Sequence, residues 1–589
     1  MRIRSVLLAA CIAISPTVAI GAAVDDVNAG LAAYQRAAYA DAVDLFTRAI
    51  GSNELAGNNL AAALSNRGLA RAGAGDHGGA VADFDRALGV RADLGAALAG
   101  RAVSLRSLGR LDDAAADAQK ALALDPLDRA ARHVLAAVRF DQGKFDEAVQ
   151  LYSGLLQGNA NDAVALINRG TAYLALNDAP KAVPDFSAVI RLQPQNSMAV
   201  YYRGVGYAQA QMWERADADF QMVTRMRPDF ADGFYQRGMT WLARDRADWA
   251  EEQFDLALKV DARHVQSLLG RADARNRRNN LQGALADVEA VLAVQPNNAE
   301  ALAMRGGLRV ALGQVTEAIG DYDRVLQAQP ANLTAAANRA AALARTGNYA
   351  EAHNAFTQVV EMAPNDWRGY AARGTAARLL GRNADAIADH ARAVVLAPDI
   401  AANHFALGVD RMVSGDGPGA LADFTAALAR DPRFVDALAA RGELQLRAGA
   451  LAQAGADFDA VLAVAPRSAG VLVNRGIVHH RAGDAAAARK SFDAALAIEP
   501  RSFSAFYNRG NAFAAEGAFE QALADYTAAI AIQPTAEAHH NRANALAALG
   551  RNDDALKGYE AAIAQDPGNA LYAANRAKLR ELMGLPNGG

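Results

Sequence analysis

Small and aromatic residues return along the chain at a fixed interval of 34 residues. The clearest marker is proline, which lies on this interval at positions 126, 194, 228, 296, 330, 364, 398, 432, 466, 500 and 534. When each repeat is numbered so that this proline is position 32, position 20 is alanine in all sixteen copies. Position 8 is glycine or alanine, and position 24 is phenylalanine or tyrosine in thirteen copies. A regular period of this length indicates a repeated structural unit.

Each repeat predicts two helices, over its positions 1–14 and about 17–30. Glycine at position 15, present in eleven copies, suits the left-handed residue that ends a helix. Proline at position 32 stops the second helix, because it lacks an N–H donor. Small residues at positions 8 and 20 allow the two helices to approach closely. One such pair cannot bury its apolar faces alone, so we expect the pairs to stack.

This combination resembles the tetratricopeptide repeat family, and the copy at residues 503–534 (FSAFYNRGNAFAAEGAFEQALADYTAAIAIQP) shows it most fully. The resemblance implies an all-α fold, an α-solenoid superhelix of about sixteen helix–turn–helix repeats with a C-terminal capping helix. The low aromatic content, 6%, also argues against a core built of β-sheet.

The repeats occupy nearly the whole chain. We expect a signal peptide over residues 1–22, sixteen repeats over 23–569, a capping helix over 570–583 and a short tail over 584–589. In the capping helix, Leu571, Leu579 and Leu582 are expected to face inward. A four-residue insertion near Gly51 to Leu60 separates the first two repeats.

The N-terminus has the pattern of a bacterial secretory signal peptide. A short basic start at Arg2 and Arg4 precedes an apolar stretch, and small residues follow near Gly21, where we expect cleavage. The apolar stretch is too short to span a bilayer as a mature helix. A lipoprotein is the alternative, since Cys11 follows Leu-Ala-Ala, and only this lipidation would bring the protein into contact with a membrane.

Arginine outnumbers lysine by 53 to 7, and the excess gathers at position 7 of the repeats. In nine of the repeats with arginine at position 7, position 23 is aspartate. Because the helices reverse near position 15, these two positions lie at nearly the same height, which predicts an ion pair across each repeat. The nine pairs are Arg67–Asp83, Arg101–Asp117, Arg169–Asp185, Arg203–Asp219, Arg271–Asp287, Arg305–Asp321, Arg373–Asp389, Arg441–Asp457 and Arg509–Asp525. The alternative is a row of arginines that binds an anionic polymer. Leu135 with Leu151 replaces both members in one repeat, whereas Leu407 with Asp423 breaks the correlation.

No motif for catalysis or for cofactor binding occurs. The sequence lacks HExxH, GxxxxGK[ST], GxSxG and a dinucleotide fingerprint, and its ten histidines form no ligand cluster. We therefore expect no enzyme activity, no metal and no cofactor. The formal charge of −4 argues against a nucleic-acid partner.

The family resemblance places the binding surface on positions 2, 5, 9 and 12 of the first helices, which line the inside of the superhelix. Aromatic residues are dense near residues 197–264, and Arg271, Arg275, Arg277 and Arg278 follow. We therefore expect a peptide-binding patch at Met198, Tyr201, Val205, Tyr235, Met239, Leu242, Asp273 and Asn276.

Family members that grip a C-terminal carboxylate carry lysine at position 5 and asparagine at position 9. Here Asn511 and Asn544 occupy position 9, but position 5 holds Tyr507 and His540, so this type of adaptor is not expected.

The sequence thus predicts a non-enzymatic scaffold for proteins or peptides, exported to the periplasm or cell envelope. The alternative is a structural subunit of an envelope assembly, in polysaccharide secretion or outer-membrane assembly. A repeat-fused enzyme is a third, weaker candidate, since it needs a non-repeat domain.

Overall fold

The described chain is built from helices alone, which confirms the expected all-α repeat fold. The computed structural model describes residues 21–586, and these hold 33 helices and no strand. They divide into two compact units, one ending at Ala301 and the other beginning at Leu302, within α18 (Ala299–Ala311). Residues 1–20, which make up most of the expected signal peptide and include Cys11, lie outside the described residues. Tail residues 587–589 also lie outside them.

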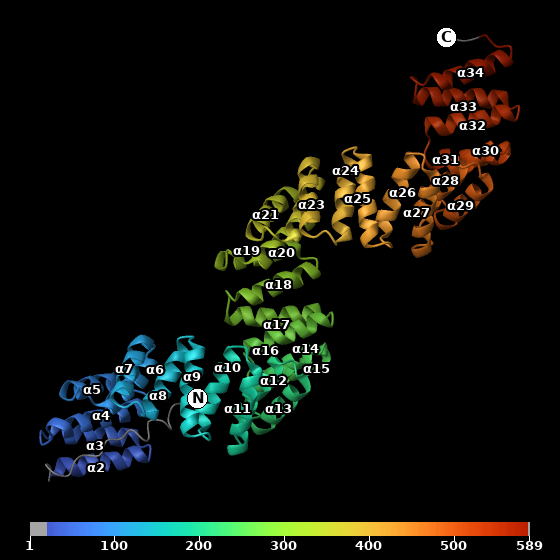
Figure 1. Ribbon diagram of the computed structural model, residues 1–589. Helices are drawn as coiled ribbons and strands as arrows, with labels where there is room; N and C mark the ends of the chain where they lie inside the picture. Colours follow the sequence, from blue (N-terminus) through green and yellow to red (C-terminus); the bar gives the residue numbers. More distant parts are fainter. Residues whose placement is uncertain (1–20, 587–589) are drawn as a thin grey trace. The chain divides into compact units, whose positions relative to one another are not determined.

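The first unit contains eight helix pairs, each packed against the next (Figure 1). The pairs are α2 (Ala22–Gln35) with α3 (Tyr39–Gly51), α4 (Gly57–Ala74) with α5 (His77–Val90), α6 (Gly95–Ser107) with α7 (Leu111–Leu124), α8 (Arg129–Asp141) with α9 (Phe145–Gly158), α10 (Ala163–Ala175) with α11 (Ala179–Leu192), α12 (Ser197–Gln209) with α13 (Trp213–Met226), α14 (Ala231–Ala243) with α15 (Ala247–Val260), and α16 (Val265–Arg277) with α17 (Leu281–Val294). The residues inserted between the first two repeats lengthen α4, which begins at Gly57 rather than at residue 61.

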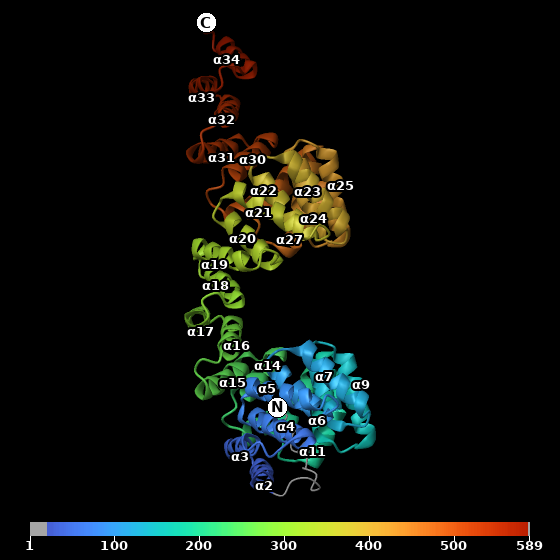
Figure 2. The same cartoon turned by 90° about the vertical axis from the view of Figure 1, so that its left-hand side faces the viewer.

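The second unit repeats the arrangement and ends with a single helix, α34 (Ala570–Leu582), packed on α33 (Figure 2). Its pairs are α18 with α19 (Val315–Ala328), α20 (Leu333–Arg345) with α21 (Tyr349–Met362), α22 (Trp367–Leu379) with α23 (Asn383–Leu396), α24 (Ala401–Val413) with α25 (Gly417–Arg430), α26 (Val435–Arg447) with α27 (Leu451–Val464), α28 (Ala469–Arg481) with α29 (Ala485–Ile498), α30 (Phe503–Ala515) with α31 (Phe519–Ile532), and α32 (Ala536–Ala548) with α33 (Asn552–Gln565).

A left-handed residue at position 15 separates the two helices of every repeat. Eleven of these residues are glycines, such as Gly75 with φ of 93°. The other five also have positive φ although they carry side chains: Ala37, Asn177, Gln211, Asp245 and Asn279. The packing of the helices therefore imposes this turn even where the local sequence does not favour it.

The two helices of a repeat meet where an aromatic ring lies against a small residue. The alanines at position 20 are completely buried in all sixteen repeats, from Ala42 to Ala555. Position 8 of the first helix faces the ring at position 24 of the second helix. A Cβ on Gly170 would lie 2.7 Å from the ring of Phe186, and one on Gly510 would lie 2.8 Å from that of Tyr526. A larger residue at position 8 would force the helices apart.

All nine expected arginine–aspartate pairs form two parallel hydrogen bonds. In each repeat, Nε and Nη2 of the arginine donate to the two carboxylate oxygens of the aspartate. The shortest N···O distances are 2.5 to 2.7 Å. The planar guanidinium matches the carboxylate, so each pair fixes the register of its two helices.

Many of these arginines also contact the preceding repeat. In five repeats Nη1 donates, within 3.2 Å, to position 25 of the preceding second helix. The five contacts are Arg67–Thr47, Arg101–Asp85, Arg169–Ser153, Arg271–Asp255 and Arg509–Asp493. We call this arrangement the arginine clasp, because one side chain joins three helices of two repeats.

The exceptions to the clasp have local explanations. Asp423 faces Leu407, and it pairs instead with Arg411 one turn further along α24, at 2.7 Å. Burial nevertheless raises the pKa of the Asp423 carboxyl. At position 24 of α23, His390 replaces the usual aromatic ring, and its Nδ1 lies 2.5 Å from the buried carboxylate of Asp410. Here a polar pair fills the space between two repeats.

The terminal helix α34 differs from its expectation in one respect. Leu579 is buried as expected, but the second buried residue is Tyr572, while Leu571 and Leu582 are 56% and 75% exposed. Tyr572 and Leu579 occupy positions 3 and 10 of the repeat, which face the preceding helices.

None of the described helices has the length and hydropathy that crossing a bilayer requires.

Removing one member of a clasp should cost far more stability than replacing both. Asp185→Ala leaves the Arg169 guanidinium partly buried without its carboxylate, and we expect a loss of about 3 kcal/mol. The double variant Arg169→Leu/Asp185→Leu copies Leu135 and Leu151, and it should lose less than about half of that. Hydrogen exchange in α10 and α11 measures the difference, because stability in a stack of repeats is local.

The matched control is Arg110→Ala, which removes an ion pair with Asp113 whose side chains are both more than half exposed. It should change stability by less than about 1 kcal/mol. Equal losses in Asp185→Ala and the double variant would contradict the clasp as the element that fixes register.

Candidate functional site

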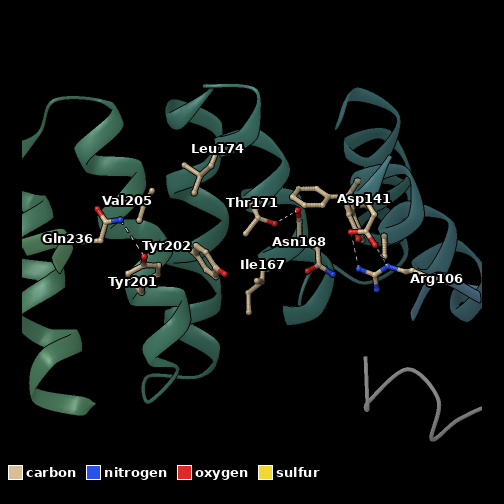
Figure 3. Close-up of a pocket in the computed structure, with 13 residues that line it drawn as sticks. Arg106, Asp141, Ile167, Asn168, Thr171, Leu174, Tyr201, Tyr202, Val205 and Gln236 are labelled. Atoms are coloured by element: carbon tan, nitrogen blue, oxygen red, sulfur yellow. Dashed lines mark hydrogen bonds and ion pairs between the residues drawn. The ribbon is translucent and has the colours of Figure 1, made fainter. Parts of the chain in front are cut away.

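A hollow of about 450 Å³ lies along the first helices of five consecutive repeats in the first unit. Its lining comes mainly from positions 5, 6, 9, 12 and 13 of α6, α8, α10, α12 and α14 (Figure 3). The residues are Arg106, Ala137, Phe140, Asp141, Tyr152, Ile167, Asn168, Thr171, Leu174, Tyr201, Tyr202, Val205 and Gln236. The volume is in the range of sites that hold small ligands or segments of chain.

An ion pair forms one end of this hollow. Nε of Arg106 on α6 donates to Oδ2 of Asp141 on α8 at 2.5 Å, and Nη2 donates to Oδ1 at 3.2 Å. Both side chains remain partly exposed, at 24% and 31%. The two charges compensate each other, so this end presents polar atoms without a net charge.

An asparagine stands at the centre of the hollow. Asn168 lies on α10 between the apolar side chain of Ile167 and the hydroxyl of Thr171, which donates to the main-chain oxygen of Asn168 at 2.8 Å. Behind it, burial raises the pKa of Tyr152, whose hydroxyl is within hydrogen-bonding reach of Asn168. A side-chain amide offers both a donor and an acceptor, which are the two groups that a peptide main chain needs.

Two tyrosines of α12 form the other end. Gln236 on α14 donates to the hydroxyl of Tyr201 at 3.5 Å, and burial raises the pKa of Tyr201 to about 12. The ring of Tyr202 stacks on Phe186 with centroids 5.7 Å apart. Tyr201 packs edge-on against Phe230, with ring centroids 5.3 Å apart. The rings are therefore held firmly, and the Tyr201 hydroxyl remains neutral at physiological pH.

The structure assembles only part of the expected patch. Tyr201 and Val205 line the hollow, whereas Met198, Tyr235, Met239, Leu242, Asp273 and Asn276 do not. Leu242 is 5% exposed and packs in the core beside Trp241. Tyr235 packs on Phe254 and His264. Asp273 forms an ion pair with Arg277 at 3.0 Å, while Met239 is 38% exposed outside the hollow.

Position 6 is the signal that the sequence interpretation missed. Asn168, Tyr202 and Gln236 occupy this position in three consecutive repeats, and each lines the hollow. The interpretation used positions 2, 5, 9 and 12 and gave weight to aromatic density, so the expected patch is centred further along the chain than this hollow. Arg106 and Asp141 were not considered because both lie outside the aromatic-dense stretch of residues 197–264.

The arginines after this region do not form a free positive patch. Arg271 pairs with Asp287 and Asp255, Arg275 and Arg278 pair with Glu251, and Arg277 pairs with Asp273. Their charges are compensated within the first unit, which removes the argument for an anionic ligand there.

In the second unit, asparagines at position 9 bind tyrosines of their own repeats. The hydroxyl of Tyr526 donates to Oδ1 of Asn511 at 2.8 Å, and that of Tyr559 donates to Oδ1 of Asn544 at 2.7 Å. These asparagines therefore satisfy hydroxyls of the helix packing, and tyrosine rather than phenylalanine stands at position 24 in both repeats.

His540 belongs to the same polar network. It is 6% exposed, and Nδ2 of Asn575 lies 2.8 Å from its Nε2. An amide nitrogen donates, so Nε2 accepts and carries no proton. Burial lowers the pKa of His540 below its usual value of 6.5. Within residues 21–586, no group of three or more His, Cys, Asp or Glu side chains is placed to hold a metal ion.

Comparison with known families agrees with this architecture. Models described as tetratricopeptide repeat match residues 100–163, 167–229, 269–332, 338–402, 405–470, 453–504, 503–535 and 536–569. The chain belongs to the tetratricopeptide repeat family. Proteins built of these repeats bind other proteins or peptides, and this chain is accordingly a protein-interaction scaffold.

Two solved structures are among those similar to this chain. The Cut9-Hcn1 hetero-tetramer of the APC/C matches with a TM-score of 0.38 and 14% identity, over 78% of this chain and 98% of that chain. YrrB, described as a TPR protein with an unusual peptide-binding site, matches with a TM-score of 0.28 and 24% identity, over 31% of this chain and 95% of that chain. No curated protein matches the sequence.

The buried histidine predicts an acid-sensitive C-terminal region. Well above pH 6.5 the imidazole of His540 is neutral in the folded and unfolded chain alike, so its contribution to stability is complete. As the pH falls through 6.5, the unfolded chain takes up a proton before the folded chain does, and the free energy of unfolding decreases. Hydrogen exchange of α32 and α34 as a function of pH measures this loss.

The variant His540→Gln should flatten this pH profile, because it has no titrating ring. His539→Gln serves for comparison, since burial and the charge of Arg542 lower the pKa of His539 as well. An unchanged profile in His540→Gln would show that His540 is not the group responsible.

Proposed function

We propose that this chain is a non-enzymatic scaffold, exported to the periplasm or cell envelope, that binds an extended segment of a partner protein in the hollow between Arg106 and Gln236. The observation that carries the proposal is the alternation of apolar walls with few polar groups along five parallel first helices. Such a surface holds side chains in apolar recesses and the main chain by hydrogen bonds.

The polar groups are spaced along the hollow rather than gathered at one point. The ion pair of Arg106 and Asp141 stands at one end, the amide of Asn168 in the middle, and Tyr202 with Gln236 at the other end (Figure 3). A linear ligand can use all three places, whereas a small compact ligand can use only one. This spacing favours an extended peptide.

The composition of the hollow also indicates which side chains such a peptide carries. Phe140, Ile167 and Val205 supply apolar surface, and the only charges in the lining compensate each other. A segment with neutral, partly apolar side chains fits this lining better than a highly charged segment, because burying unpaired charges is costly.

Export is supported by the sequence of residues 1–22, with its basic start, short apolar stretch and small residues near Gly21. The chain also has a single cysteine, Cys11, which lies within the same segment. Removal of the segment leaves a chain without thiols, which suits an oxidising compartment.

Substitutions in the hollow should weaken peptide binding without unfolding the protein. Peptides selected from a random library for binding to the full chain provide the probe, and fluorescence anisotropy measures their Kd. Asn168→Ala should weaken binding about tenfold, because it removes hydrogen bonds to the peptide main chain. Tyr202→Ala should have a similar or larger effect through lost packing.

Trp249→Ala is the matched control, since this exposed aromatic residue lies on α15, outside the hollow. Its Kd should stay at the wild-type value. Selected peptides that bind equally well to both hollow variants would locate the binding surface elsewhere.

Export can be tested separately from binding. Expression of the full chain in a bacterium should yield periplasmic protein whose N-terminus, determined by mass spectrometry, lies near residue 22. Leu8→Asp interrupts the apolar stretch and should leave the unprocessed chain in the cytoplasm.

Cys11→Ser distinguishes the two export routes, because it leaves an ordinary signal peptide intact but prevents lipidation. A lipid attached to Cys11 would favour the anchored envelope subunit over the soluble scaffold. Recovery of wild-type protein with its original N-terminus in the cytoplasm would reject export.

A further inference from the structure

A second hollow, of about 380 Å³, opens on the other face of α8. It is lined by Gln119 of α7, by Arg132, Leu135 and Arg139 of α8, and by Glu147, Gln150, Leu151 and Gly154 of α9. The α8 residues are positions 4, 7 and 11 of the repeat. With 3.6 residues per turn, they point away from Ala137, Phe140 and Asp141, the α8 residues that line the first hollow, which we call the groove hollow. The two hollows are therefore separate.

This second hollow lies where the arginine clasp lies in other repeats. Leu135, Leu151 and Gln119 occupy position 7, position 23 and position 25 of the preceding helix. In the next repeat the same three places hold Arg169, Asp185 and Ser153, joined by hydrogen bonds of 2.7 to 3.1 Å. The replacement of the clasp by two leucines leaves unfilled the space that a guanidinium and a carboxylate fill elsewhere.

Arg139 lacks the carboxylate that its counterparts have. Four other repeats carry arginine at position 11, and each pairs with the aspartate at position 23: Arg71–Asp83, Arg275–Asp287, Arg309–Asp321 and Arg411–Asp423, at 2.7 to 2.9 Å. Beside Arg139, position 23 is Leu151. Nε of Arg139 pairs instead with Glu147, whose side chain is 52% exposed, at 2.9 Å, and Nη1 donates to Gln142.

Arg132 adds a second cation to the rim. Position 4 is apolar and buried in neighbouring repeats, as at Leu98 and Leu166, but here it is an arginine that is partly exposed. One of its nitrogens, Nη2, donates to the carbonyl oxygen of Pro126. The lining thus carries two arginines and one glutamate around a floor of Leu135 and Leu151.

We propose that this second hollow binds a partner peptide through an acidic side chain and an adjacent aliphatic side chain. The carboxylate takes the place of the missing position 23 aspartate beside Arg139, with Arg132 on the other side. The aliphatic side chain packs on Leu135 and Leu151. The excess of positive charge on the rim and the apolar floor match these two groups together, and the site is independent of the proposed function of the groove hollow.

The test uses a fluorescein-labelled pentapeptide, Gly-Leu-Glu-Leu-Gly, and its glutamine analogue, with the full chain and fluorescence anisotropy as the readout. The acidic peptide should bind about tenfold more tightly than the glutamine peptide, because the carboxylate forms charge-assisted hydrogen bonds. Arg139→Gln should remove this preference. Trp249→Ala, distant in sequence and absent from the lining, should leave binding unchanged.

A filling variant decides whether the hollow itself is the site. Leu135→Arg/Leu151→Asp introduces the arginine–aspartate pair that nine repeats already contain, so the helices should remain folded while the space is occupied, and peptide binding should fall about tenfold or more. Circular dichroism verifies the fold, and if this variant does not fold, Arg139→Gln remains decisive.

Retention of binding in the folded filling variant, or equal binding of the two peptides to the wild-type chain, would overturn the proposal. Self-association that the filling variant abolishes would also overturn it, because the occupant would then be a second copy of the chain.

Discussion

The close approach of two helices at a small residue is the constraint on which the rest of this structure depends. An aromatic ring at position 24 lies directly over position 8, where a Cβ on Gly170 or Gly510 would come within 2.8 Å of the ring. The same ring lies on a residue of the next repeat, since a Cβ on Gly100 would be 2.6 Å from Phe84. In the repeats that carry it, this ring therefore sets the spacing of the two helices within the repeat and contributes to the spacing from the next repeat.

The arginine clasp adds a second, directional constraint. Ring packing fixes how close the helices lie but leaves them free to slide, whereas two parallel hydrogen bonds between a guanidinium and a carboxylate define one register. Its net stabilisation is small, because desolvation of the two charges offsets much of their attraction. This balance explains why two leucines can replace the clasp in α8 and α9, and why the buried pair of His390 and Asp410 is tolerated in the second unit.

The sequence predicts the fold well because the determining positions recur sixteen times. Even so, the left-handed turns at Ala37 and Gln211 could not be read from their own residues, since neither favours positive φ. They follow from the neighbouring repeats, whose packing leaves no other path for the chain. The burial of Tyr572 in place of Leu571 has the same origin, because position in the repeat outweighs hydrophobicity.

The candidate site was harder to predict, because it depends on the residues that differ between repeats. Tyr201 was found through aromatic density, but Asn168 and Gln236 are unremarkable in one repeat and become informative only when position 6 is compared along three of them. The polar pair of His390 and Asp410 joins different repeats at positions that are mostly apolar or aromatic elsewhere, so no pattern within one repeat indicates it.

Uniform repeats and specific binding place opposite demands on the sequence. Positions 8 and 20 hold only small residues and position 24 is aromatic in thirteen repeats, whereas the exposed faces of the first helices are free to differ from repeat to repeat. A surface that distinguishes one partner from another therefore has to be composed of departures from the repeat pattern. Asn168, Tyr202 and Gln236 on one face of the first unit, and Leu135 with Leu151 on another, are departures of this kind, and both sets line hollows.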